Sequence, residues 1–157
     1  MNALPPIVDH DERDALVVRT DYGDEEAWQA VVKALGEPWA DGELKSFVHF
    51  VDDPIWAGAS VDQVLAAVAG EESLGVVFIA DQVTMQAEHH ALLAVNAFTR
   101  EELGDECYEE TVEFGREFRT APIGVQDVYA NVHVANLGFE EYAEGARDYP
   151  EGVYRSF

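Results

Sequence analysis

The stretch FVHFVDDPIWAG, residues Phe47–Gly58, decides the fold of this chain. It begins with β-forming apolar residues that only His49 interrupts, a pattern typical of a strand covered on both faces in a parallel sheet. The run Asp52–Pro54 ends the strand, because aspartate favours turns and proline cannot donate a hydrogen bond to a neighbouring strand. The residues that follow, Ser60–Gln63, have the form of a capping box and predict the start of a helix.

Similar apolar runs lie before and after this strand. Ala15–Thr20 and Leu74–Ala80 have the composition of buried strands, and an acid follows each of them closely. Asp24 is placed to cap a helix that ends near Leu35, and a second helix is predicted over Val61–Ala69. Strands and helices that alternate with short connections predict right-handed crossovers and three neighbouring parallel strands.

The second half of the chain predicts an antiparallel extension of the sheet and C-terminal helices. A polar connection at 82–90, of one helical turn at most, leads to a fourth strand, and a fifth strand runs antiparallel to the fourth. The acidic segment between these two strands is expected to form a short helix, with a solvated excursion as the alternative. The predicted ranges are strands Leu92–Phe98 and Glu117–Ala121, the acidic segment 100–117, helices 127–135 and Phe139–Ala146, and an edge strand or docked tail at Val153–Phe157.

Together these segments predict one α/β domain over residues 1–157, with three layers and a mostly parallel central sheet. The expected order at its centre is βαβαβ. A length of 157 residues suits one domain with a sizeable core, since 48% of the residues are hydrophobic. Residues 1–14 are polar and are expected to form an irregular arm.

Charge is the most unusual property of the composition. The chain has 32 acidic residues against 9 lysines and arginines, a net charge of −23. Such a field repels nucleic acid and anionic lipid, so neither is expected as a partner, whereas basic proteins and metal ions are attracted. The competing interpretation is that the acids only keep the protein soluble. The sequence leaves the oligomeric state open.

The sequence also bears on location and on known catalytic motifs. No apolar run approaches the ~20 residues of a membrane span, and no signal peptide is evident at the N-terminus, so a cytoplasmic protein is expected. The single cysteine, Cys107, excludes an intrachain disulfide. The sequence contains no serine nucleophile elbow and no glycine-rich phosphate-binding motif, so nucleophilic or nucleotide chemistry is not indicated.

Carboxylates follow three of the predicted strands. Because the carboxyl ends of parallel strands meet at one edge of a sheet, these side chains are expected to converge there. Converging carboxylates suit Mg²⁺ or Ca²⁺, which would make the protein a metal-dependent enzyme, for instance a hydrolase. The alternative is that they are turn formers and helix caps, as aspartate after a strand often is. The candidate metal ligands are Asp21, Asp52, Asp53 and Asp81.

The densest run of acids predicts a surface for a basic protein partner. Eight acids lie between Glu101 and Glu117, and aromatic side chains nearby are typical of binding hot spots. This pattern favours a non-enzymatic binding protein without a cofactor, comparable to an immunity or inhibitor protein. The candidate contact residues are Glu106, Tyr108, Glu109, Glu110 and Glu113, together with Trp56.

Several short motifs also resemble a known family. They are LVVRTDY at 16–22, FVDDP at 50–54, FIAD at 78–81, HALLAV at 90–95, ANLGFEEYA at 135–143 and GVYRSF at 152–157. On these the chain resembles a family of uncharacterised bacterial, mainly actinobacterial, proteins defined only as a domain of unknown function. The resemblance implies a stand-alone cytosolic domain and supplies no activity, cofactor or catalytic residue.

Overall fold

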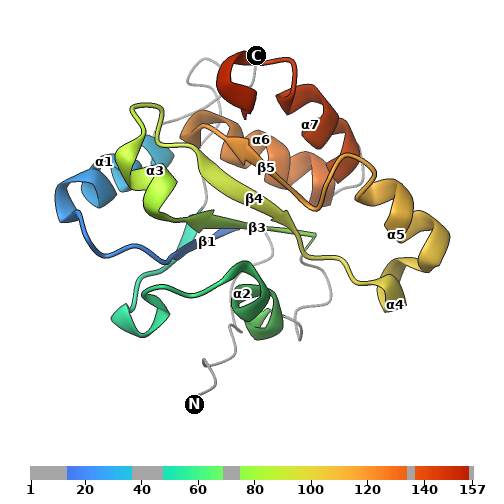
Figure 1. The fold of residues 1–157 in the computed structure, drawn as a ribbon, viewed down its shortest axis with the longest axis horizontal. Helices are drawn as coiled ribbons and strands as arrows, with labels where there is room; N and C mark the ends of the chain where they lie inside the picture. The colour runs from blue at the N-terminus through green and yellow to red at the C-terminus, as the bar shows by residue number, and fades with distance from the viewer. Residues whose placement is uncertain (1–13, 37–47, 69–74, 134–136, 156–157) are drawn as a thin grey trace.

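The computed structural model describes residues 14–36, 48–68, 75–133 and 137–155. A six-stranded sheet in the order β2-β1-β3-β4-β5-β6 lies at its centre (Figure 1). Of the arm predicted for residues 1–14, all but the last residue lies outside the described residues. The strands are β1 Ala15–Arg19, β2 Val48–Val51, β3 Val76–Ala80, β4 Leu92–Asn96, β5 Glu117–Thr120 and β6 Val153–Tyr154.

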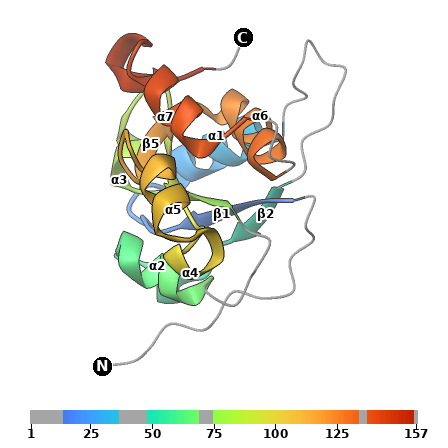
Figure 2. The same cartoon turned by 90° about the vertical axis from the view of Figure 1, so that its right-hand side faces the viewer.

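Helices cover both faces of the sheet, which gives the three predicted layers. Helices α1, α6 and α7 lie on one face and α2 on the other, as Figures 1 and 2 both show. The helices are α1 Glu25–Leu35, α2 Val61–Ala67, α3 Gln82–Gln86, α4 Arg100–Leu103, α5 Asp105–Thr111, α6 Pro122–His133 and α7 Phe139–Ala146. Two short 3₁₀ helices, η1 Pro54–Trp56 and η2 Pro150–Gly152, complete the described elements.

Strand directions confirm the predicted sheet. β1 pairs in parallel with both β2 and β3, with Val17 opposite Phe50 and Phe78. β4 is antiparallel to β3 and to β5, and β6 is parallel to β5. Five of the six strands therefore run in one direction, and all five end at the edge where β4 begins. We call this edge the carboxyl edge.

Helix caps predicted from the sequence form as expected. The Asp24 carboxylate accepts a hydrogen bond from the Ala27 N–H at 2.9 Å and caps α1. At the start of α2 the side chain of Gln63 accepts from the Ser60 N–H at 2.8 Å, while the Ser60 hydroxyl accepts from the Gln63 N–H at 3.1 Å. These bonds satisfy N–H groups that have no partner within the helix, so each helix start is fixed locally.

One large hydrophobic cluster joins the sheet to the helices. Every residue of β1, β3 and β4 is buried. On one face Trp28 of α1 meets Phe50 of β2 edge-to-face, with ring centres 5.7 Å apart. Trp56, in the loop after β2, and Val64 of α2 are also buried in this cluster. Aromatic packing of this kind adds to the area that each ring removes from water.

Three sequence predictions need correction. β2 is half-buried along its length, not covered on both faces, because it is the last strand of the described sheet on its side. α6 begins at Pro122 and not at residue 127, since proline is well suited to the first turn of a helix. The acidic segment forms two short helices separated by Gly104, whose φ of 83° ends α4.

Among the described residues, every helix is too short or too polar to span a lipid bilayer.

The difference in burial between the strands predicts a difference in stability. Ile79 of β3 is 3% exposed, so Ile79→Ala should lower the free energy of unfolding by about 2–4 kcal/mol. Val48→Ala, in half-buried β2, should lower the free energy of unfolding by clearly less, because the methyl groups that it removes are already partly exposed to solvent. Urea unfolding of the two variants checks this order, and a larger loss for Val48→Ala would contradict the observed burial.

Candidate functional site

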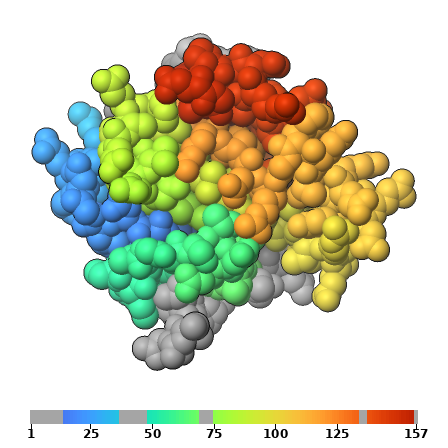
Figure 3. Space-filling view, viewed as in Figure 1, coloured from blue at the N-terminus to red at the C-terminus, as the bar shows by residue number. Residues whose placement is uncertain are grey.

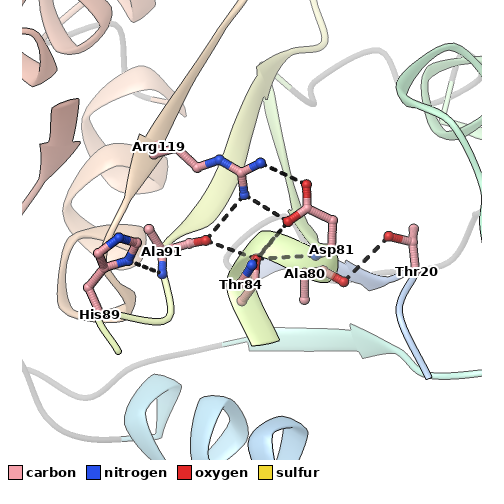
Figure 4. Close-up of polar contacts among 7 residues, drawn as sticks. All are labelled: Thr20, Ala80, Asp81, Thr84, His89, Ala91 and Arg119. Atoms are coloured by element: carbon pink, nitrogen blue, oxygen red, sulfur yellow. Dashed lines mark hydrogen bonds and ion pairs between the residues drawn. The ribbon is translucent and has the colours of Figure 1, made fainter. Parts of the chain in front are cut away.

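The carboxyl edge brings together residues that are far apart in the chain. Asp81 follows β3 and begins α3, while Arg119 comes from β5 on the far side of β4. Figure 4 shows the Arg119 guanidinium lying across the edge, directed at Asp81 and at the carbonyl of Ala91. Residues of three neighbouring strands therefore meet in one network of hydrogen bonds.

The contact between Arg119 and Asp81 is bidentate. The Arg119 Nη1 and Nη2 atoms donate to the two carboxylate oxygens of Asp81, each at 2.8 Å. Nη1 also lies 3.3 Å from the Ala91 carbonyl oxygen, which accepts from the Thr84 hydroxyl at 2.8 Å. The Asp81 carboxylate caps α3 as well, through the Thr84 N–H at 3.2 Å. A planar guanidinium matches a carboxylate in this geometry, so both groups are fixed in place.

This network of hydrogen bonds lowers the pKa of the Asp81 carboxyl. Burial raises the pKa of the Asp81 carboxyl, but the Arg119 guanidinium and the hydrogen bonds from Thr84 outweigh burial and hold this pKa below its usual range. Asp81 is therefore ionised at neutral pH, and its charge is neutralised by a residue of the same sheet.

A second arginine occupies the same edge at the end of β1. Arg19 is 2% exposed, and its guanidinium lies over the rings of Tyr22 and Trp28, with its central carbon 4.1 and 4.9 Å from the ring centres. It donates to Asp52 at 3.2 Å and to Glu25 at 2.8 Å. A buried guanidinium held by carboxylates and aromatic faces is a stable arrangement, because its charge is paired and its planes are covered.

The Asp52 carboxylate serves several neighbours at once. One oxygen accepts from Arg19, and the other accepts from the indole N–H of Trp28 at 3.2 Å. The Tyr22 hydroxyl is buried and has no hydrogen-bond partner of ordinary geometry among the described residues, although Asp52 acts on it electrostatically. Burial, and then the charge of Asp52, raise the pKa of Tyr22 to about 12, so the phenol keeps its proton at neutral pH.

The two remaining candidate metal ligands form local turns. The Asp21 carboxylate accepts from the Gly23 N–H at 2.8 Å, and the Asp53 carboxylate accepts from the Ile55 N–H at 3.1 Å. Within the described ranges, no three histidine, cysteine, aspartate or glutamate side chains lie close enough together to hold a metal ion. The geometry therefore favours the interpretation of these aspartates as caps and arginine partners.

The second candidate site projects from the body of the molecule. Residues 100–117, which we call the acidic lobe, contain α4 and α5, which extend away from the sheet (Figures 1 and 3), and end at the first residue of β5. Four predicted contact residues of the lobe are exposed, and Tyr108 is half-exposed beneath the Arg100 guanidinium, 4.5 Å from the ring centre. The four exposed residues are Glu106, Glu109, Glu110 and Glu113.

Trp56 does not join the acidic lobe. Its side chain is 2% exposed and belongs to the hydrophobic core, so its prediction as a contact residue is wrong. The 3₁₀ turn after β2 directs the ring inward, because an indole gains more from burial than from solvent contact.

Sequence reasoning missed the two arginines that organise the carboxyl edge. One signal was present for Arg19, which ends an otherwise apolar strand and so had to be buried with a counter-charge. Arg119 gave no such signal, since it lies in a short polar strand, 38 residues from Asp81.

One known protein family matches almost the whole chain. Residues 14–157 match the family described as Domain of unknown function (DUF6924), and the chain belongs to this family. Comparison with curated proteins finds no match. The match confirms the part of the resemblance that placed the chain in a family defined only as a domain of unknown function, and it assigns no activity.

The pKa of Asp81 predicts how stability depends on pH. Because this pKa is lower in the folded than in the unfolded protein, the unfolded chain takes up the proton first as the pH falls. The stabilisation is therefore complete above the unfolded value of about 4 and is lost below it. Asp81→Asn keeps a helix-capping oxygen and should unfold more easily than wild type by about 1–3 kcal/mol at pH 7.

Urea unfolding of wild type and Asp81→Asn between pH 7 and pH 3 measures this contribution. The difference between the two proteins should shrink below about pH 4, whereas other carboxylates titrate in both and cancel. An equal difference at pH 7 and pH 3 would contradict a charge-dependent bond.

A metal titration distinguishes the two interpretations of the strand-end aspartates. If Asp21, Asp52, Asp53 and Asp81 serve the fold, millimolar Mg²⁺ or Ca²⁺ should raise the melting temperature no more than Na⁺ at equal ionic strength. A true metal site would add a further increase, because an ion that binds only the folded state stabilises it. An extra increase that Asp52→Asn removes would establish the metal site and overturn the structural interpretation.

Proposed function

We propose that this protein is a small acidic binding protein of the cytoplasm that engages a basic protein partner, as immunity and inhibitor proteins do. One observation carries the proposal: the acids divide into two groups. Aspartates at the carboxyl edge are held by arginines and backbone N–H groups. Carboxylates of the acidic lobe face solvent on two short projecting helices.

Charge balance within the lobe supports this use. Arg100 lies 3.5 Å from Asp105 and 3.6 Å from Glu109, and Arg116 pairs with Asp62 of α2 at 3.0 Å. Among the described residues Glu106, Glu110 and Glu113 form no ion pair. Most of the lobe's negative charge is therefore not neutralised by the protein itself. Such a field attracts a basic partner over about 10 Å at ordinary ionic strength and accelerates its association.

A metal-dependent hydrolase and a purely solubilising charge would require other features than those observed. A metal-dependent hydrolase needs converging carboxylates, which the described part of the chain does not provide. A charge that serves solubility alone requires no concentration of acids on one projecting segment. The proposed interaction uses both the density of the acids and their projection.

Neutralising the lobe tests the proposal. Glu106, Glu109, Glu110 and Glu113 are replaced together by glutamine, which keeps their size and leaves the fold intact. Wild type and this variant are used as baits to capture partners from the native cell, and the association rate is then measured with the purified partner. The variant should associate several-fold more slowly and with a weaker dependence on salt, mainly through the on-rate.

A matched control removes the same number of charges from elsewhere. Glu26, Glu140, Glu144 and Asp148 lie on or next to α1 and α7, and they are replaced by the corresponding amides. The control should bind the partner almost as fast as wild type. Equal slowing by both variants would mean that only net charge matters, and unchanged binding of the lobe variant would remove the basis of the proposal.

A further inference from the structure

A pocket opens on the carboxyl edge, whereas the acidic lobe joins β4 to β5 at the opposite edge of the sheet. Its volume is about 330 Å³, which is within the range of small ligand sites. Glu88, His89 and His90, which precede β4, form one wall of this carboxyl-edge pocket. The other wall is apolar and consists of Ala34 of α1 with Pro122 and Ile123 of α6.

Exposed apolar side chains follow several strands along the same edge. The large hydrophobic residues that remain exposed in the described structure are Ile55, Val83 and Ile123, at 51%, 48% and 55%. Each lies in the first turn after a strand that ends at the carboxyl edge, namely β2, β3 and β5. Of these three side chains, Ile123 lines the carboxyl-edge pocket.

Hydrogen bonds determine which ring nitrogens of His89 and His90 are donors and which are acceptors. The His90 Nδ1 lies 2.9 Å from the Thr84 carbonyl oxygen, which can only accept, so the proton is on Nδ1 and Nε2 of the neutral ring is an acceptor. The His89 Nδ1 accepts from the Ala91 N–H at 3.0 Å, and its Nε2 lies 3.3 Å from a Glu151 carboxylate oxygen. His90 also has a φ of 50°, a left-handed conformation that non-glycine residues adopt mainly under functional or structural constraint.

The opposite wall does not favour an anion. α6 begins with a proline, which has no N–H, and the Gly124 N–H is already bonded to the Ala121 carbonyl oxygen at 2.9 Å. The helix start therefore offers few free donors. On the other side, the carboxylate of Glu88 and the Nε2 atom of His90 are acceptors. Apolar walls with acceptors at one side suit a cation on an apolar stem.

We propose that the carboxyl-edge pocket receives an arginine or lysine side chain of a basic protein partner. The stem lies against Pro122 and Ile123, and the cationic group meets Glu88 and the free nitrogen of His90. This inference rests on the proposed function for the source of the side chain. It adds a second contact that the acidic lobe does not supply, with the lobe attracting the partner and the pocket holding one residue of it.

The pocket is tested with a small cation, independently of any natural partner. In an NMR titration, n-butylguanidinium chloride should shift the amide signals of residues 34, 88–91, 121 and 123, and the His90 imidazole signals, in a saturable way. Butyramide, which has the stem without the charge, and NaCl, which has charge without the stem, should each give much smaller shifts. Shifts spread over the whole acidic surface, or equal to those with NaCl, would contradict a specific cation-binding site in the pocket.

Two variants and a peptide complete the experiment. Glu88→Gln and Ile123→Ser should each weaken binding of n-butylguanidinium several-fold, while Glu26→Gln on α1 should leave it unchanged. Equal effects of Glu88→Gln and Glu26→Gln would refute a specific site. The peptide acetyl-Gly-Arg-Gly-amide should bind at the same residues, and a pocket that takes the free cation but not this peptide would refute a protein partner as its source.

These outcomes are separable from those of the lobe variant. If the pocket binds n-butylguanidinium while the four lobe substitutions leave partner binding unchanged, the pocket stands and the role of the lobe fails. If the lobe variant slows association but the titration shows no local binding, the proposed function stands and the pocket fails.

Discussion

The ion pair between Arg119 and Asp81 is the contact on which the carboxyl edge depends. It links β5 to the end of β3 across the first residues of β4, with both donor–acceptor distances at 2.8 Å. Through Asp81 it fixes the start of α3, and through Thr84 it reaches the Ala91 carbonyl oxygen and the imidazole of His90. The position of the pocket wall is therefore determined by a bond between two strands that are not neighbours.

Arg19 plays the corresponding part at the other end of the edge. Its guanidinium is buried between two aromatic rings and is held by Asp52 and Glu25. Two of the few cations in a chain of net charge −23 are thus used inside the structure, next to the carboxylates that would otherwise repel one another. Glu106, Glu109, Glu110 and Glu113 of the acidic lobe stay on the surface. The two arginines stabilise the carboxyl edge, and too few cations remain to neutralise the acidic lobe.

Local signals in the sequence were sufficient for most of the fold. Apolar runs predicted β1 and β3, and the residues after β1 and β2 predicted the caps at Asp24 and Ser60, because each of these depends on a few neighbouring residues. The use of the strand-end aspartates could not be predicted in this way. Arg19 lies 33 residues from Asp52 and Arg119 lies 38 residues from Asp81, so only the folded sheet brings them together. Burial of Trp56 was missed for a similar reason, since a turn residue shows no periodicity that would reveal which way it points.

The acids of the carboxyl edge are used within the fold, and those of the acidic lobe are available to a cation. Carbon-13 NMR of the side-chain carboxyl groups measures both groups in one experiment as tetralysine is added. The signals of Glu106, Glu109, Glu110 and Glu113 should shift, while those of Asp52 and Asp81 should stay in place because each carboxylate is already bonded to an arginine. Shifts of Asp52 and Asp81 at lower tetralysine concentration than those of the lobe, or equal shifts of all carboxyl groups, would contradict this division of the acids.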